Sequence, residues 1–233
     1  MTRLAIIHTT AATVEPLKAL AAEIVPGVEV VNFVDDSILP QLRENGDDVS
    51  QVEDRLLHYA IFAEQVGADA ILSACSSVGE VAAQMRERVR VPVVRIDDAM
   101  AEEAVTRGDI IGVAATLVTT LNPTQRLIRA KASAQARAVE IKTQVVDAAY
   151  QRLMAGDPAG HDALLAEALE ALAAETDVVV LAQASMARAV VEVSRSRSRG
   201  FGVFSTQRTY LKGSVSRRSS TPYSLFRRYS KTS

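Results

Sequence analysis

Residues 69–77, Asp-Ala-Ile-Leu-Ser-Ala-Cys-Ser-Ser, decide the fold, because a short apolar run here ends in the only cysteine of the chain. The run Ala70–Ala74 predicts a buried strand of a parallel sheet, and residues 78–85 then show helical spacing. Cys75 therefore lies where a strand passes into a helix, where open α/β sheets hold their ligands. A helix N-terminus favours the reactive thiolate, although a lone cysteine is more often a small buried apolar residue.

Apolar runs that predict strands alternate with helical patterns along most of the chain. This alternation predicts an α/β protein whose parallel strands are joined by right-handed crossovers. The longest helices are expected at residues 52–66, 119–137 and 162–174. Strands are expected at Leu4–Ile7, Val28–Phe33, Ala70–Ala74, Val91–Ile96, Ile110–Ala114, Val139–Val145 and Val178–Ala182, with Phe201–Phe204 as a further candidate.

The composition of the chain excludes several classes of protein. The 233 residues are 48% hydrophobic, enough for one α/β domain or two small lobes. A single cysteine excludes an intramolecular disulfide framework and a multi-cysteine zinc site, and it fits a reducing compartment. No apolar run approaches the ~20 residues of a membrane span. We therefore expect a soluble cytoplasmic protein with no membrane partner.

Charge is distributed unevenly along the chain. Residues 191–233 hold 10 of the 26 Lys and Arg residues but 1 of the 28 Asp and Glu residues, so residues 1–190 carry a formal net charge of −11. The acidic body argues against nucleic acid as its partner. The Ser/Arg-rich segment from Ser194 onward predicts disorder, a basic arm that binds nucleic acid, or an altered terminus.

Two segments of the chain match in register. Asp69 precedes Cys75 by six residues, and Asp177 precedes Gln183 by six residues, with an apolar run between the members of each pair. Two unrelated strand–helix units can look alike, but a duplicated fold explains the match more fully. We then expect a first lobe over residues 1–95, a second over 96–193 and a tail over 194–233, with a return of the C-terminal segment to the first lobe left open.

Four motifs carry a resemblance to a known family. They are His8-Thr9-Thr10, Ala74–Ser77, Gly112–Thr116 with Thr119, and Leu181–Met186. This pattern resembles the aspartate/glutamate/hydantoin racemase superfamily over about residues 3–186. The resemblance implies two similar α/β lobes related by a pseudo-twofold axis, with parallel sheets flanked by helices and a site in the cleft between them. It also implies an enzyme that needs no cofactor, moves a proton beside a carboxylate and uses one cysteine from each lobe.

The resemblance assigns roles residue by residue. Cys75 matches the first catalytic cysteine, Ser76 and Ser77 fall where the family binds a substrate carboxylate, and Thr10 is expected to hold this carboxylate with them. Hydroxyl groups and helix-start N–H groups suit a carboxylate and the enediolate-like charge that forms beside it. An ordinary helix cap is the alternative reading for each threonine. Further residues that would line the pocket are Thr9, Thr10, Thr116, Thr119 and Ser185.

Gln183 departs from the family pattern, because it occupies the position of the second cysteine. Its amide can hydrogen-bond but cannot act as an acid or base at neutral pH. A symmetric two-thiol racemase is therefore disfavoured, and Gln183 is expected to orient the substrate. A single thiol can still protonate one face of a carbanion, as in an arylmalonate-decarboxylase-like lyase, or add to a double bond, as in a maleate-type cis–trans isomerase.

The histidines are the remaining candidates for a functional role. His8 is a candidate general base for Cys75, although a lone histidine after a strand is more often a hydrogen-bonding residue. The three histidines show no metal-ligand spacing, and no Gly-rich phosphate motif is present. The expected partner is a small carboxylate-bearing substrate, and the Ala-rich helix surface permits a homodimer. A carboxylate-binding protein without catalysis is the rival from another class.

Overall fold

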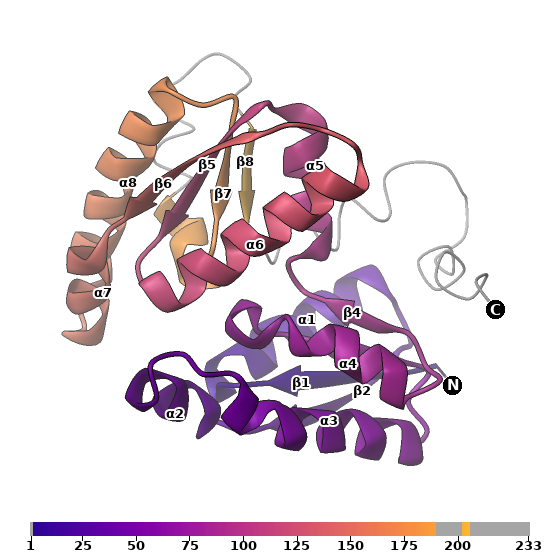
Figure 1. Cartoon of the computed structure of the whole chain (residues 1–233). Coiled ribbons are helices and arrows are strands. Elements are labelled where there is room, and N and C mark those ends of the chain that lie inside the picture. Colours follow the sequence, from indigo (N-terminus) through magenta and orange to yellow (C-terminus); the bar gives the residue numbers. More distant parts are fainter. Residues whose placement is uncertain (1, 190–201, 206–233) are drawn as a thin grey trace. The chain divides into compact units, whose positions relative to one another are not determined.

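The computed structural model describes residues 2–189 and 202–205, and these divide into two compact units with the chain boundary between Ile96 and Asp97. Each unit contains one parallel sheet of four strands with helices packed against it (Figure 1). The predicted α/β class with two parallel sheets flanked by helices is confirmed. The predicted tail lies outside the described residues, except for residues 202–205.

The first unit, residues 2–96, has the strand order β2-β1-β3-β4. Its strands are β1 (Arg3–His8), β2 (Glu29–Val34), β3 (Ala70–Ser73) and β4 (Val93–Arg95). Its α-helices are α1 (Val14–Ile24), α2 (Ile38–Glu44), α3 (Ser50–Gln65) and α4 (Val81–Arg88), with the 3-10 helices η1 (Ala11–Thr13) and η2 (Ser76–Val78). Apolar residues of α2, α3 and α4 form one core with β1 and β3.

The second unit repeats this order as β6-β5-β7-β8. Its strands are β5 (Ile110–Ala115), β6 (Glu140–Val145), β7 (Val178–Leu181) and β8 (Gly202–Ser205). Its helices are α5 (Asp98–Arg107), α6 (Val118–Ala134), α7 (Asp147–Met154), α8 (Pro158–Ala174) and the 3-10 helix η3 (Ala184–Arg188). Because strand side chains alternate, α5 and α6 cover one face of the sheet and α7 and α8 the other (Figure 1).

The two aspartates that revealed the internal match play the same part in each unit. Asp69 Oδ2 accepts a hydrogen bond from Arg3 N at 2.7 Å, and Asp177 Oδ2 accepts one from Ile110 N at 2.9 Å. Each carboxylate thus binds the N–H group at the start of the neighbouring central strand. Hydrogen bonds from the N–H groups of Ile110 and Asp109 lower the pKa of Asp177. The sequence match therefore reflects equivalent positions in two copies of one topology.

Two helix boundaries differ from those that the sequence pattern indicated. The pattern placed a helix over residues 78–85, but Val78 is the last residue of η2 and α4 begins at Val81. The pattern also began the second-unit helix at Asp162, whereas α8 begins at Pro158. Proline fits the first helical turn because its missing N–H would have no partner there. The Asp157 carboxylate caps this end by accepting a hydrogen bond from Gly160 N at 2.8 Å.

The apolar segments of the chain are buried in these cores. The central strands β3 and β7 are buried at every position, as expected for strands covered on both faces. Among residues 2–189 and 202–205, no helix has the length and apolar character that a membrane span requires.

Candidate functional site

The carboxyl end of β3 presents the only thiol of the chain. Cys75 follows β3 by two residues and is the N-cap of η2, with an extended backbone at φ −135° and ψ 120°. Its side chain is half-buried, and the thiol is free. Its apolar part packs against the core that β1, β3 and the helices of the first unit share. The thiol is thus anchored by a rigid strand and keeps part of its surface open.

Hydrogen-bond donors surround the start of η2. Ser76 and Ser77 are its first two residues, and both are largely buried. Within the described part of the chain, no acceptor binds their backbone N–H groups. Unpaired N–H groups are normal at a helix start, where they attract negative charge. These groups can bind a carboxylate beside Cys75.

The carboxyl end of β1 lies beside β3 and carries both threonines. Ile7 pairs with Ser73, and Ala74 N donates to Ile7 O at 2.9 Å. Thr9 lies two residues after Ile7 and is 3% exposed. No partner for its N–H group or its hydroxyl is found among residues 2–189 and 202–205. Thr10 acts instead as the cap of η1, because its Oγ1 accepts from Ala12 N at 3.3 Å.

His8 is the fully buried last residue of β1. Its Nδ1 lies 2.8 Å from Thr13 Oγ1, and its Nε2 lies 2.9 Å from Asn32 Oδ1. Burial lowers the pKa of His8, while the hydrogen bond from the ring to Asn32 partly opposes this shift. Both ring nitrogens are therefore engaged within the first unit, and neither hydrogen-bonds to Cys75.

The second unit holds the counterpart of the cysteine turn. Gln183 is the N-cap of η3, with φ −134° and ψ 143°, close to the values at Cys75. Its Oε1 accepts two hydrogen bonds from Thr116, one from the backbone N–H at 2.6 Å and one from Oγ1 at 2.9 Å. Both bonds fix the orientation of the amide. The Nε2 group remains as a donor.

Hydrogen bonds to the strands align the two turns residue by residue. Ala182 N donates to Ala114 O at 2.9 Å, as Ala74 N donates to Ile7 O. Gln183 follows Ala182 as Cys75 follows Ala74, so these two residues are equivalent. Thr116 lies two residues after Ala114, as Thr9 lies two residues after Ile7, so the two threonines are equivalent as well. Alternate residues of a strand direct their N–H groups to the same neighbour, so the Thr9 and Thr116 N–H groups point to equivalent places. In the second unit the Gln183 carbonyl oxygen accepts from the Thr116 N–H group. The shorter Cys75 side chain provides no such acceptor for the Thr9 N–H group.

The other two predicted residues lie nearby in the second unit. Thr119 is the second residue of α6, and Ser185 is the second residue of η3; both are half-buried. Within the described residues, no hydrogen bond joins either one to the Thr116–Gln183 pair. The structure thus brings Thr9, Ser76 and Ser77 to the cysteine end of one sheet, and Thr116 and Gln183 to the same end of the other.

Sequence reasoning missed a contact of the cysteine turn, between Gly79 and Arg95 at the end of β4. A Cβ atom at Gly79 would lie 2.7 Å from Arg95 Nε and 2.5 Å from its Cζ. The Arg95 guanidinium therefore packs directly against the turn that begins at Cys75. The sequence holds no signal for this, because an isolated arginine at a strand end looks like any surface cation.

Metal-binding side chains do not gather in the described part of the chain. No group of three or more His, Cys, Asp or Glu side chains with ligand geometry occurs among residues 2–189 and 202–205. His8 and His161 are both buried and lie in different units.

Comparisons with known proteins agree with the fold. The model of the Asp/Glu/hydantoin racemase family matches residues 4–206. Comparison with curated protein sequences gave no significant match. A glutamate racemase from Bacillus anthracis has 15% identity and a TM-score of 0.69, with 91% of this chain and 79% of that chain covered.

Two further solved structures show the same fold. An aspartate racemase homologue from Pyrococcus horikoshii has 18% identity and a TM-score of 0.68, with 91% of this chain and 97% of that chain covered. Arylmalonate decarboxylase has 17% identity and a TM-score of 0.56, with 91% of each chain covered. Proteins that share this architecture thus include racemases and a decarboxylase.

Proposed function

The chain belongs to the Asp/Glu/hydantoin racemase family, and from this premise we propose that it is a cofactor-independent enzyme that moves a proton at the carbon next to a carboxylate. Its substrate is a small acid or amino acid, and Cys75 is the group that removes or returns the proton. Ser76, Ser77 and Thr9 bind the carboxylate.

One observation carries this proposal. In the second unit the amide oxygen of Gln183 lies 2.6 Å from Thr116 N and 2.9 Å from Thr116 Oγ1. In the first unit the same two donors of Thr9 have no partner among the described residues, and a thiol stands in place of the amide. The Gln183 amide oxygen therefore occupies, in the second unit, the position that we infer for an sp² oxygen of the ligand in the first unit. A carboxylate oxygen at Thr9 would satisfy both donors.

The chemistry follows from these donors. The Cys75 thiolate takes the proton from the carbon, so that an S–H bond forms as the C–H bond breaks. The bonding electrons move into the carboxylate and give an enediolate-like species. N–H and O–H groups fixed in place before reaction stabilise this charge more than they stabilise the substrate. Return of the proton from sulfur reverses the step.

Gln183 cannot replace the second cysteine that the family resemblance implies at its position. Its amide neither takes nor gives a proton at neutral pH, and its orientation is fixed by Thr116. A thiol on one side alone exchanges the α-proton with retention, whereas racemisation needs a second acid or base on the other side.

A lyase is the second candidate, and the single thiol favours it. Loss of CO₂ from a malonate-type acid leaves the same enediolate, which Cys75 can protonate on one face. The likeness to arylmalonate decarboxylase concerns the fold and permits this reaction on the same scaffold. Addition of the thiolate to a maleate-type double bond is a further outcome that the same test detects.

Solvent isotope exchange tests the proposal. Small amino acids, 2-substituted malonates and maleate are incubated with the enzyme in D₂O, and the products are read by NMR. We expect deuterium at the α-carbon of at least one acid and loss of the exchange by at least about 10³-fold in Cys75→Ser. Binding without exchange would identify a carboxylate-binding protein. Exchange that survives in Cys75→Ser would exclude Cys75 as the acid–base group.

A further inference from the structure

We propose that His8 is a positioning residue for the carboxylate site, and that its protonation sets how firmly the Thr9 donors are held. A chain of hydrogen bonds leads from the His8 ring through Thr13 to the carbonyl group of Thr10. This inference rests on the proposed carboxylate site, but its first test needs neither ligand nor turnover.

Thr9 lies between two anchored carbonyl groups. His8 O accepts a hydrogen bond from Asp35 N at 3.0 Å, and Asp35 follows β2. The C=O group of His8 and the N–H group of Thr9 belong to one planar trans peptide and point in opposite directions. Because β1 lies between β2 and β3, the Thr9 N–H group is thereby directed toward β3. On the other side of Thr9, the carbonyl oxygen of Thr10 accepts from Thr13 Oγ1 at 3.1 Å.

The hydrogen atoms of this chain can be counted. Asn32 Oδ1 only accepts, so His8 Nε2, which lies 2.9 Å away, carries a hydrogen. The Thr13 hydroxyl has one hydrogen and donates it to Thr10 O. Thr13 Oγ1 can then only accept from His8 Nδ1, which lies 2.8 Å away. The complete chain therefore requires a hydrogen on both ring nitrogens, which is the imidazolium form of His8.

A neutral His8 ring cannot complete the chain. Burial lowers the pKa of His8, and the hydrogen bond to Asn32 only partly opposes this shift, so the ring is neutral at pH 7. The neutral ring keeps its hydrogen on Nε2, which faces Asn32 Oδ1, and Nδ1 becomes an acceptor. The Thr13 hydroxyl then turns to donate to Nδ1, and Thr10 O loses this bond. Protonation of His8 thus fixes the turn after Thr9 and adds a positive charge next to it.

The elements beside His8 carry few ionisable groups at this edge of the sheet. The described ones are Glu15 on α1, Asp35 and Asp36 after β2, and Cys75 after β3. Glu15 and Asp36 are exposed, and the Asp35 carboxylate accepts from Arg55 and from the Tyr59 hydroxyl. The causes of the pKa shift of His8 include no charged group. A carboxylate bound at Thr9 would therefore supply a counter-charge that the described side chains do not give His8.

Histidine ring NMR tests the chain without any ligand. The protein holds three histidines, and the signals lost in His8→Gln assign His8. We expect the neutral ring to be the Nε2–H tautomer and to titrate below the ordinary histidine pKa of about 6.5. The amide nitrogen of Ala11 shares a peptide bond with the Thr10 carbonyl, so its chemical shift should follow the same titration. A neutral Nδ1–H tautomer, or an Ala11 signal that does not follow His8, would overturn the inference.

Thr13→Val isolates the step between His8 and Thr10. Valine keeps the shape of threonine but has no hydroxyl, so the Ala11 signal should no longer respond to pH while His8 still titrates. Thr13→Ser returns the hydroxyl and should return the response. An Ala11 response that persists in Thr13→Val would contradict the role of Thr13.

Oxalate binding links the chain to the site. Oxalate stays doubly ionised across this pH range, so its affinity reports changes in the protein alone. We expect the affinity to rise about fivefold or more as the pH falls through the His8 midpoint, because a poorly screened positive charge is gained beside the site. By linkage, saturating oxalate should raise the pKa of His8. Oxalate affinity that does not depend on His8 protonation would overturn the inference.

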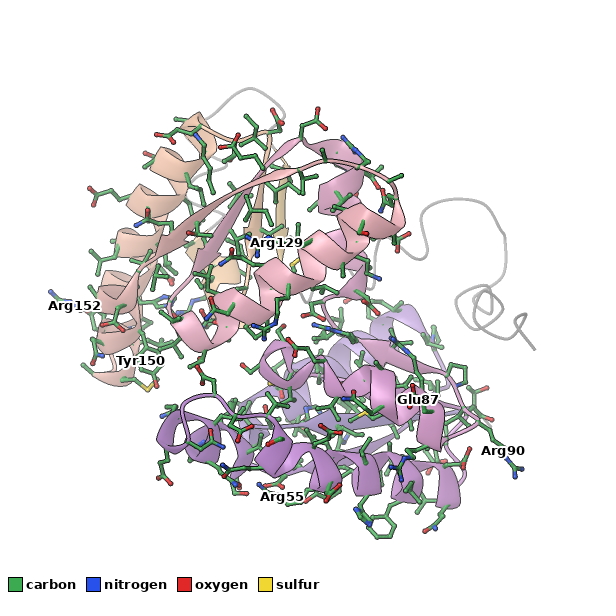
Figure 2. All side chains as sticks on the ribbon, viewed as in Figure 1. Arg55, Glu87, Arg90, Arg129, Tyr150 and Arg152 are labelled. Carbon is green, nitrogen blue, oxygen red and sulfur yellow. The ribbon has the colours of Figure 1, made fainter. Side chains whose placement is uncertain are left out.

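Asn32→Asp shifts the effect along the pH axis and keeps the histidine in place. A carboxylate still accepts from Nε2 and stabilises the imidazolium, so the pKa of His8 and the midpoint of oxalate binding should both rise by about one unit or more. Arg90→Gln changes the net charge by the same amount and is the control, because Arg90 is exposed and projects from the first unit (Figure 2). It should leave both midpoints unchanged. Unchanged midpoints in folded Asn32→Asp would count against the inference, since a purely structural role predicts them.

Failure of this inference and failure of the proposed function have different signatures. Oxalate binding that follows His8, without isotope exchange on any acid, would refute the proposed catalysis and leave this inference standing. Absence of oxalate binding at every pH would refute the carboxylate site, and with it the role of His8 in binding, whatever the Ala11 signal does.

Discussion

The turn after β3 and the turn after β7 share a backbone but differ in chemistry. Cys75 and Gln183 have the same N-cap conformation within about 25° in φ and ψ, and each follows a strand that pairs in the same register. The Gln183 side chain accepts from both Thr116 donors, whereas the Thr9 donors have no partner among residues 2–189 and 202–205. The difference separates a structural turn from a candidate binding turn without reference to any other protein.

Gln183→Cys would make the two turns alike and is expected to have the largest effect. A thiol at the position where the family resemblance implies the second cysteine would supply the other acid–base group, so we expect racemisation of an acid that the native protein exchanges with retention. Thr116 loses the acceptor for two donors, which we expect to cost about 1–3 kcal/mol of unfolding free energy. Chiral chromatography and thermal unfolding measure the two effects.

Gln183→Asn is the matched control for this variant, because it keeps an amide but shortens the side chain. It is expected to lower stability in the same way without producing racemisation. Inversion by the native protein itself would show that the second face already has an acid or base, and the comparison of the two turns would fail.

Substitution of valine for the equivalent threonines, Thr9 and Thr116, is expected to have smaller effects than Gln183→Cys. One substitution should lower activity and the other should lower stability. Thr9→Val removes a donor that only a ligand satisfies, so we expect isotope exchange to fall about 10²-fold with stability within ~0.5 kcal/mol of native. Thr116→Val removes a hydrogen bond within the fold, so we expect a loss of about 1 kcal/mol. Denaturant unfolding and exchange rates on both variants separate the two roles. Equal effects at both positions would contradict the assignment.

Apolar patterning was sufficient to predict the buried strands β3 and β7, because a parallel strand covered on both faces needs a continuous apolar run. Residues 70–73 and 178–181 illustrate this, and the six-residue spacing from Asp69 to Cys75 and from Asp177 to Gln183 indicates the duplication in the sequence itself. Helix starts were harder to predict. Pro158 resembles a helix breaker in sequence, yet it begins α8 because Asp157 caps the turn.

Side-chain contacts across the sheet could not be predicted from local patterns. The bond from Thr116 to Gln183 joins residues 67 positions apart. Gly79 has an ordinary helical φ, so no turn signal marked it, and its meaning appears only when Arg95 packs against it. His8 was predicted as a base for Cys75 because both lie at the same edge of one sheet. Its ring nitrogens instead contact Thr13 and Asn32, which no local pattern indicates.

His161 offers the smallest test of the comparison. Buried residues recur at 52, 56, 60 and 63 in α3 and at 161, 165, 169 and 172 in α8, so His161 occupies the position of Val52. His161 is fully buried, and its Nε2 has no partner within residues 2–189 and 202–205. Its Nδ1 lies 2.6 Å from Asp162 Oδ1. A buried polar atom without a partner lowers stability.

His161→Leu replaces this ring with an apolar side chain of similar size. Removal of an unpaired buried nitrogen gains about 1–3 kcal/mol, and loss of the hydrogen bond to Asp162 offsets part of it, so we expect a net gain of about 1 kcal/mol. Asp162 keeps its ion pair with Arg188, whose Nε lies 3.1 Å from Oδ2. Denaturant unfolding measures the gain, and Val52→His is the reciprocal change, expected to destabilise the first unit. A loss of stability in His161→Leu would mean that Nε2 binds a buried water molecule, and that the two units differ at this position for a structural reason.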